Sequence, residues 1–339
     1  MNQHNCFFPS LTRIADLEHK PFEIESLARE HWETGDYVQA EVTGVRGQSY
    51  VLELNTGRMM EAMPGDKVIG AFGMRAATLV GVGTWEAIEN DNCMEALTSA
   101  GLFGKSTSVS PLMPKFMSLK YLGHVTRAKT KLNMRDFVQP VQERKLETPV
   151  VLLVGTSMSA GKTTTGRVVI HELKRCGYSV VGAKLTGAGR YRDVLSFGDA
   201  GADHIFDFVD AGLPSTVCEP DEYHVRLRNL LSRIAAIDVD VLVAEAGASP
   251  LEPYNGATAI EEIRDNVRCT ILCASDPYAV AGVQAAFDFQ PDLVSGPAAN
   301  TDAAVSLVEK LTGVRALNLM EPSSTPALAE LLKEKLSLH

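Results

Sequence analysis

The stretch from residue 150 to 165 constrains the fold more than any other, because it predicts a strand, a glycine-rich turn and a helix in immediate succession. Five apolar residues, Val150 to Val154, predict a buried strand. The turn runs from Gly155 to Gly161, and Lys162 opens a helix that we expect to continue to about Cys176. In this arrangement the N–H groups of the turn and the helix N-terminus point at one place, where they bind an anion.

A lysine and a hydroxyl at the start of that helix are typical of a phosphate-binding loop. In that motif the lysine reaches the β- and γ-phosphates of a nucleotide and the next hydroxyl ligates Mg²⁺. The usual motif has four residues between its glycines, whereas five separate Gly155 from Gly161. A chance Gly-Lys-Thr is the alternative, but the strand-to-helix context favours the motif. The residues predicted to bind the nucleotide phosphates are Gly155, Thr156, Ser159, Ala160, Gly161, Lys162, Thr163 and Thr164.

Composition and charge argue against several other classes of protein. The net charge of −10 disfavours a general nucleic-acid binder. The apolar runs are shorter than the roughly 20 residues that span a bilayer, and the first residues lack the features of a secretory signal. The six cysteines form no Cys-x-x-Cys pair, which fits a reducing compartment. We therefore expect a cytoplasmic protein with neither a nucleic-acid nor a membrane partner.

The chain of 339 residues is long enough for two domains, and the first 145 residues predict a smaller, β-rich one. Residues 1–34 read as a lead-in, with apolar residues at helical spacing over residues 22–32. From residue 35 to 145 the apolar period is two and glycine turns recur, which predicts a small β-barrel or sandwich. The predicted strands are 37–42, 49–54, 67–72, 77–82 and 116–122, and residues 91–100 are predicted as a helix.

From residue 146 to 339 strands alternate with helices, after a charged linker at 143–147. Such alternation predicts an α/β fold with a mainly parallel, doubly wound sheet that carries the phosphate loop. Beyond the first strand and helix, the predicted strands are 179–184, 239–245, 269–274, 292–295 and 315–319. The predicted helices are 223–234, 279–287, 301–311 and 326–336.

Two charged residues end predicted strands at the edge where open α/β sheets bind ligands. Glu245 ends an apolar run, where a P-loop protein holds the acid that binds Mg²⁺, although such a pattern also arises by chance. Lys184 ends the second strand and supplies positive charge for a phosphoryl group or a substrate carboxylate. A solvated lysine at a turn is the competing interpretation. We predict Lys162, Lys184 and Glu245 as catalytic residues, and Lys184, Thr186 and Arg190 as substrate-binding residues.

Two further positions are candidates for the same site. Residues 193–210 contain five aspartates, one of which could join Thr163 and Glu245 as a magnesium ligand or act as a general base. Asp199 is our first choice, and most of the others are expected to cap helices or face solvent. Asn300 follows the fifth predicted strand, where it would hydrogen-bond a nucleotide base. A helix N-cap is an equally good explanation for Asn300.

Residues 148–320 resemble the dethiobiotin-synthetase-like branch of P-loop NTPases. That family's Gly-Thr-x-x-x-x-Gly-Lys-Thr loop has the same five-residue gap and matches the stretch from Gly155 to Thr163. Its second strand ends in a lysine, matched by Lys184 with a tighter gap to the following Thr186-Gly187. Its Val-Glu-Gly-Ala-Gly stretch is matched loosely by Ala244-Glu245-Ala246-Gly247, where alanines replace the valine and the first glycine. The resemblance implies ATP-dependent activation of a small carboxylate, Mg²⁺-ATP held by Thr163 and Glu245, and usually a homodimer.

The stretch Asp207-Phe-Val-Asp-Ala-Gly212 also resembles the P-loop family that includes D-glutamate N-acetyltransferase, which implies that the loop holds the phosphates of coenzyme A. Our main hypothesis is a Mg²⁺-ATP-dependent enzyme of the ligase or kinase type that activates or phosphorylates a small anionic metabolite. A coenzyme A-dependent N-acyltransferase and a nucleotide-switched binding protein are the alternatives. The sequence does not identify the substrate, the role of the β-rich domain or the oligomeric state.

Overall fold

The computed structural model describes residues 6–44, 51–287 and 290–337. The chain divides into two compact units. The first unit holds Met1–Pro140 together with two short segments of later chain, Ala188–Arg192 and Phe208–Glu219. The second unit holds Val141–Gly187, Asp193–Asp207 and Pro220–His339. The predicted domains are continuous stretches of chain, and they therefore do not include these two short segments in the first unit.

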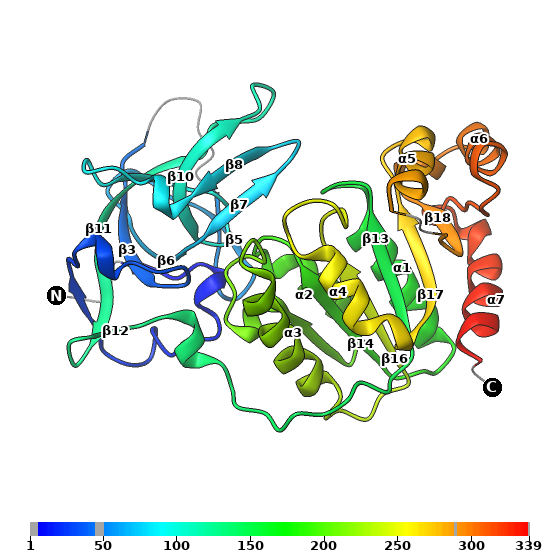
Figure 1. Cartoon of the computed structure of the whole chain (residues 1–339), viewed down its shortest axis with the longest axis horizontal. Helices are drawn as coiled ribbons and strands as arrows, with labels where there is room; N and C mark the ends of the chain where they lie inside the picture. Colours follow the sequence, from blue (N-terminus) through cyan, green and yellow to red (C-terminus); the bar gives the residue numbers. More distant parts are fainter. Residues whose placement is uncertain (1–5, 45–50, 288–289, 338–339) are drawn as a thin grey trace. The chain divides into compact units, whose positions relative to one another are not determined.

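Five strands close into a ring in the first unit (Figure 1). In ring order they are β3 (Tyr37–Val42), β6 (Lys67–Phe72), β10 (Leu102–Val109), β9 (Cys93–Ala96) and β11 (Met117–Arg127), which pairs again with β3. Only the β6–β10 pairing of this ring is parallel. Closure leaves these five strands without a free edge. The unit's other strands are β1 (Cys6–Phe7), β2 (Glu23–Glu25), β4 (Val51–Glu53), β5 (Met59–Glu61), β7 (Met74–Ala77), β8 (Gly81–Thr84) and β12 (Thr130–Lys131).

The core of the ring follows the period-two pattern of its strands. In β3 the side chains of Val38, Ala40 and Val42 are fully buried, while the residues between them are partly exposed. Trp32 packs in the same core, and its ring is stacked on Phe72 with the centroids 4.8 Å apart. Alternating burial of this kind explains why the sequence pattern of residues 37–42 predicts a strand.

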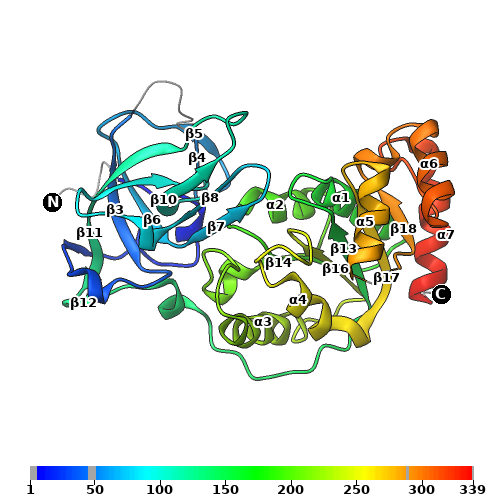
Figure 2. The same ribbon diagram turned by 45° about the horizontal axis from the view of Figure 1, so that its top comes forward.

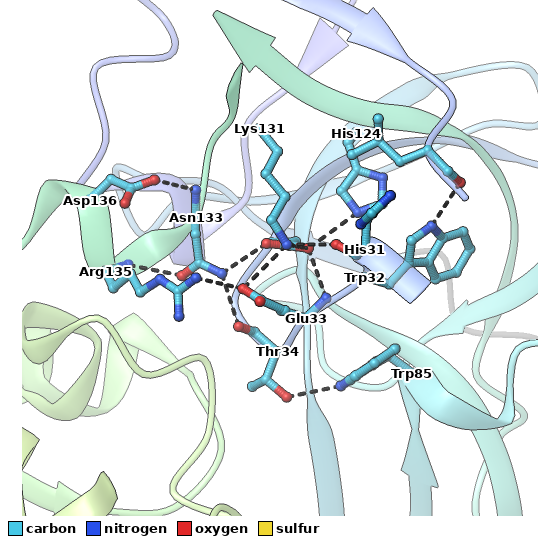
Figure 3. A network of polar contacts seen from close by, with 12 residues as sticks. His31, Trp32, Glu33, Thr34, Trp85, His124, Lys131, Asn133, Arg135 and Asp136 are labelled. Carbon is cyan, nitrogen blue, oxygen red and sulfur yellow. Dashed lines mark hydrogen bonds and ion pairs between the residues drawn. The ribbon is translucent and has the colours of Figure 1, made fainter. Parts of the chain in front are cut away.

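A buried polar network fixes the segment before β3 against β11 and β12 (Figure 3). The carboxylate of Asp36 accepts hydrogen bonds from Lys131 Nζ and Asn133 Nδ2, each at 2.9 Å. His124 Nε2 lies 3.3 Å from Asp36 Oδ2, and its Nδ1 lies 2.7 Å from the hydroxyl of Tyr121. Burial opposes ionisation of Asp36, but hydrogen bonds from His124, Asn133 and Lys131 lower its pKa below the ordinary value. The network therefore holds a charged aspartate in the interior.

Six parallel strands form the sheet of the second unit, in the order β15-β14-β16-β13-β17-β18. The strand before the glycine loop, β13, is central and lies between β16 and β17. This confirms the predicted α/β class with a parallel sheet. The strands are β13 (Val150–Gly155), β14 (Val180–Thr186), β15 (His204–Asp207), β16 (Val241–Ala246), β17 (Val267–Cys273) and β18 (Leu293–Ser295).

Helices cover both faces of this sheet (Figures 1 and 2). On one face lie α1 (Lys162–Arg175) and α2 (Tyr191–Asp199), and Phe197 of α2 is buried against Gly166 of α1 and Gly182 of β14. On the other face lie α3 (Pro220–Ile234) and α4 (Gly256–Ile263). The remaining helices are α5 (Pro277–Phe287), α6 (Asp302–Thr312) and α7 (Thr325–Leu336), of which α7 packs against α1. In the described part of the chain, none of the helices has both the length and the apolar character needed to cross a bilayer.

Several predicted elements differ from the structure. The helix predicted at residues 91–100 is wrong, because this stretch contains β9 between β10 and β11. The helical pattern over residues 22–32 is also wrong, since the stretch holds β2 and one 3-10 turn. Half of the strand predicted at 77–82 falls on the turn between β7 and β8, and its two ends belong to those strands. The strand predicted at 49–54 contains β4, and its residues 49–50 lie outside the described residues.

In the second unit, one predicted strand is wrong and three elements were not predicted. Residues 315–319 make only an isolated parallel bridge, between Ala316 and Val294. Neither β15 nor helices α2 and α4 was predicted. β15 has two apolar residues in four, too short a pattern to identify a strand, and Gly198 weakens the helical pattern of α2.

Candidate functional site

The predicted phosphate loop lies between β13 and α1. Ser159 and Gly161 adopt the left-handed conformation, with φ of +67° and +93°, and this turns the chain into the helix. Gly161 is the N-cap residue of α1, and no side chain caps the helix there. The first N–H groups of α1 are therefore left for another hydrogen-bond acceptor.

Lys162 folds back into this loop. Its side chain is buried, and its Nζ donates a hydrogen bond to the carbonyl oxygen of Ser157 at 2.8 Å. Gly155 leaves the room for the ammonium group, because a Cβ at position 155 would lie 2.5 Å from Nζ. Burial lowers the pKa of Lys162, whereas the charge of Glu245 opposes this change. The loop thus surrounds a positive charge, as phosphate binding requires.

The carboxylate of Glu245 reaches the first turn of α1 from the neighbouring strand. In β16, Glu245 is the register partner of Leu153 in β13. Thr163 Oγ1 donates a hydrogen bond to Glu245 Oε2 at 3.0 Å. Glu245 is buried, and this burial raises its pKa, while the charges of Lys184 and Lys162 act in the opposite direction.

The two oxygens of Thr163 and Glu245 fit Mg²⁺ by their chemistry and spacing. Mg²⁺ takes octahedral oxygen ligands at roughly 2.0–2.1 Å, so adjacent ligands lie about 2.9 Å apart. Thr163 Oγ1 and Glu245 Oε2 are 3.0 Å apart. Within the described residues, no group of three or more His, Cys, Asp or Glu side chains forms a metal cage. A magnesium ion here would therefore need phosphate oxygens or waters as further ligands, which is its usual preference.

Lys184 lies beside Glu245 and is paired with an aspartate. It is the register partner of Glu245 in the neighbouring strand β14. Its Nζ forms an ion pair with Asp193, in the first turn of α2, and the two side chains are only 8% and 17% exposed. Gly247, just after β16, is bound to the end of β14, since its N–H donates a hydrogen bond to Thr186 Oγ1 at 2.8 Å. The hydroxyl of Thr186 thereby fixes the loop after β16, and its predicted contact with substrate stays a prediction.

Asp193 contacts Lys184 at this edge of the sheet, whereas Asp199 lies apart from it. Asp199 is the exposed last residue of α2. Six residues of helix separate the two by about 9 Å along the axis and place them on different faces. The structure therefore does not bring Asp199 to Thr163 and Glu245 as the sequence-based choice required. Asp193 lies in the first turn of the helix that follows Lys184, and this position is the signal that could have identified it.

Asn300 lines a cavity of about 230 Å³ at the start of α1, together with Gly161, Thr164 and Pro297. The N-cap of α6 is Thr301, whose side chain accepts a hydrogen bond from the N–H of Ala304 at 3.2 Å. The alternative interpretation of Asn300 as that helix cap is therefore wrong. Its predicted contact with a nucleotide base stays a prediction.

The other predicted residues have separate surroundings. Thr156 joins the loop to β17, because its N–H donates to the carbonyl oxygen of Cys273 at 3.0 Å. Its Oγ1 accepts a hydrogen bond from the N–H of Ser275 at 3.2 Å. Ala160 is buried in the loop, whereas Arg190 is exposed and belongs to the segment Ala188–Arg192 of the first unit. The predicted contact of Arg190 with substrate stays a prediction.

No protein-family model matches the sequence. No curated protein matches it either. Several solved structures match part of the chain. A DUF1611 family protein from Anabaena variabilis is 17% identical, with 61% of this chain and 66% of that chain covered and a TM-score of 0.38.

Chloroplast FtsY from Physcomitrella patens is 13% identical, with 57% of this chain and 68% of that chain covered and a TM-score of 0.37. A de novo designed protein of the P-loop NTPase fold is 15% identical, with 56% of this chain and 94% of that chain covered and a TM-score of 0.31. The resemblance to the dethiobiotin-synthetase-like branch stays a prediction.

Proposed function

We propose that the second unit binds a Mg²⁺-nucleoside triphosphate, with ATP as the nucleotide, and uses it to activate or phosphorylate a small anionic metabolite. The observation that carries this proposal is the 3.0 Å contact between Thr163 Oγ1 and Glu245 Oε2, beside the buried ammonium of Lys162. Two oxygen ligands and a cation at a glycine loop are the parts that bind a metal-bound triphosphate.

Each residue has a distinct role in this proposal. Lys162 and the N–H groups of the loop stabilise negative charge on the transferring phosphoryl group. Thr163 and Glu245 would hold Mg²⁺, which when bound neutralises charge on the β- and γ-phosphate oxygens. Lys184 orients the anionic substrate from the neighbouring strand. Asn300 contacts the base in the cavity of about 230 Å³ that it lines with Gly161 and Thr164.

Calorimetric titration with ATP, GTP and coenzyme A, each with and without Mg²⁺, tests the proposal. We expect ATP to bind in a Mg²⁺-dependent manner, because in this proposal the carboxylate of Glu245 binds the metal. Coenzyme A binding without a metal requirement, followed by an acylated amine detected by mass spectrometry, would instead support the N-acyltransferase. Nucleotide binding that changes the affinity for a protein partner, with no small-molecule product, would support the switched binding protein.

A homodimer in the cytoplasm completes the proposal. The dimer rests only on the resemblance to the dethiobiotin-synthetase-like branch, and the compartment rests on cysteine usage. Sedimentation analysis of the purified chain tests the first of these, with a monomer at all concentrations as the contradicting result.

A further inference from the structure

We propose that Asn318 is a positioning residue that holds together two walls of the cavity beside the phosphate loop, so that the cavity accepts the base of the nucleotide. This inference rests on the proposed function, because it concerns the nucleotide that the loop binds. It assigns a role to a side chain that none of the sequence motifs includes.

The first step is that the cavity adjoins the phosphate loop. Gly161 lines the cavity of about 230 Å³ and is also the N-cap residue of α1. Gly296, which follows β18, lines the same cavity. A Cβ at Gly161 would lie 3.2 Å from Gly296 Cα, and a Cβ at Gly296 would lie 2.4 Å from the carbonyl oxygen of Ala160. A nucleotide whose phosphates lie at the loop therefore has this cavity directly beside it.

The second step is that the lining of the cavity suits a base. A base is a flat apolar ring with hydrogen-bonding groups at its edge, and ligand pockets combine apolar walls with a few polar groups. The amide of Asn300 carries both a donor and an acceptor, as the edge of adenine does. The apolar side chains of the cavity are Val168, Pro297, Leu319 and Met320.

The third step is that the amide of Asn318 joins two walls of this cavity. Its Nδ2 donates a hydrogen bond to the carbonyl oxygen of Asn300 at 3.1 Å. Its Oδ1 accepts a hydrogen bond from the N–H of Met320, also at 3.1 Å. Asn300 lies in the turn after β18 and Met320 in the segment after α6, and both line the cavity. One side chain therefore sets the distance between the two walls.

The fourth step is that the backbone contacts of this segment with β18 end before the cavity wall begins. The N–H of Leu317 donates to the carbonyl oxygen of Val294 at 3.0 Å. Asn318 comes next, and its side chain ties the segment to the turn after β18. The side chain of Met320 is 65% exposed, so packing holds it weakly. Without the amide of Asn318, we expect Met320 to move away from Asn300.

The test measures the binding of ATP and of inorganic triphosphate by calorimetry, both with Mg²⁺ and with the full chain. Triphosphate carries the groups that the loop binds but has no base. In Asn318→Ala we expect the affinity for ATP to fall about fivefold, because two hydrogen bonds are lost, and the affinity for triphosphate to stay unchanged. Asn318→Asp keeps the acceptor for Met320 but loses the donor to Asn300, so its affinity for ATP should fall as well.

A second variant changes the cavity wall itself. Met320→Ala removes a side chain that is mostly exposed, so folding should be unaffected. We expect weaker binding of ATP by this variant, with triphosphate binding equal to that of the wild type. Thermal unfolding of every variant identifies any that fails to fold, and Met320→Ala then decides the question alone.

The matched control removes another asparagine of the same unit. Asn266 is half-buried, as Asn318 is, and its Nδ2 donates to the carbonyl oxygen of Leu146 at 3.0 Å. It lies just before β17, whereas the cavity lies just after the parallel strand β18, so the two asparagines are at opposite edges of the sheet. Asn266→Ala should bind ATP and triphosphate as the wild type does.

The outcomes distinguish this inference from the function on which it rests. Equal affinity for ATP in the wild type and Asn318→Ala would overturn the inference alone. An equal loss of ATP and triphosphate binding would also overturn it, because the effect would not pass through the base. A wild type that binds triphosphate as tightly as ATP would overturn it too, although the phosphate site would stand. If the wild type bound neither, the proposed function would fall and this inference with it.

Discussion

Two glycines, Gly155 and Gly247, make room for neighbouring groups of the site because they have no Cβ atom. At Gly155 the missing Cβ leaves room for the ammonium of Lys162, which would otherwise lie 2.5 Å away. At Gly247 a Cβ would lie 1.9 Å from the carbonyl oxygen of Thr186 and 3.0 Å from Lys184 Cε. The flexible side chain of Lys184 can move away, but the carbonyl group of Thr186 is part of the sheet backbone and cannot move as easily. Gly247 should therefore tolerate a side chain poorly.

Gly247→Ala should destabilise the second unit by about 1–3 kcal/mol, the usual effect of overpacking. The reason is that the backbone of β14 or of the loop after β16 must move to admit the methyl group. Denaturant unfolding monitored by circular dichroism measures the change. Gly282→Ala in α5 is the control, since nothing lies within 4 Å of a Cβ there and the change should be neutral or stabilising. Equal stability of the wild type and Gly247→Ala would contradict the packing described here.

Glu245 should make stability depend on pH in a defined direction. Burial raises its pKa above the ordinary value of 4.5, so the folded chain binds this proton more tightly than the unfolded chain. The stabilisation from the protonated carboxyl is present below pH 4.5 and is lost as the pH rises through the raised pKa. Relative to Glu245→Gln, the wild type should therefore lose stability over that range. Denaturant unfolding of both proteins in Mg²⁺-free buffer measures this, and a pH-independent difference would be incompatible with it.

At the scale of elements, the Asp36 network adds side-chain contacts between the segment before β3 and the strands β11 and β12. Asp36→Ala leaves Lys131, Asn133 and His124 without the carboxylate that they surround. Loss of one partner from a buried ionic network costs about 3–5 kcal/mol, which we expect in the free energy of unfolding.

Tryptophan fluorescence reports this change specifically, because both tryptophans of the chain, Trp32 and Trp85, lie in the first unit. The exposed carboxylate of Glu86 supplies the control, and Glu86→Ala should change the free energy of unfolding by less than about 0.5 kcal/mol. If Asp36→Ala unfolded at the denaturant concentration of the control, the network would have no part in holding the unit together.

The elements that could be predicted from the sequence are those whose local pattern and tertiary surroundings agree. The strand from Val150 is buried on both faces, and the loop and helix after it follow the motif, so this part of the prediction is confirmed. Residues 91–100 favour a helix locally through alanine, leucine, methionine and glutamate. Their pairing with β10 and β11 in the ring outweighs that preference, and no local pattern reveals such partners.

For the site too, residues that belong to a local sequence pattern could be predicted, whereas those that depend on the surrounding fold could not. Thr163 and Glu245 could be predicted together, since each follows from a pattern at a strand end and parallel strands share one ligand-binding edge. The choice between Asp193 and Asp199 depended on where α2 begins, at Tyr191, because a helix turns aspartates six residues apart to different faces. The sequence pattern does not show where this helix starts, so it does not distinguish Asp193 from Asp199.

At the scale of the whole molecule, the chain forms its two units by returning to the first one twice. Ala188–Arg192 and Phe208–Glu219 belong to the first unit, although both follow strands of the second unit's sheet. The phosphate loop, Glu245, Lys184 and Asp193 all belong to the second unit. Ligand binding is therefore expected to stabilise the second unit.

Mg²⁺-ATP should raise the thermal stability of the protein by mass action. A ligand at 100 times its Kd adds about 2.7 kcal/mol to the stability of the state that binds it. Differential scanning calorimetry with increasing Mg²⁺-ATP measures the effect on the transition that includes the second unit. Lys162→Ala should show little or none of this shift. An equal shift in the variant would mean that the nucleotide binds elsewhere.

The most direct test of the central claim is a calorimetric titration of ATP, with and without Mg²⁺, into the wild type and Lys162→Ala. Lys174→Ala, on the same helix but paired with Asp203 at the surface, is the control. We predict Mg²⁺-dependent binding by the wild type and the control, and affinity at least about tenfold weaker in Lys162→Ala, since a charge-assisted hydrogen bond is lost. Equal affinity in all three proteins, or binding indifferent to Mg²⁺, would contradict the claim that this loop and Glu245 bind a metal-bound triphosphate.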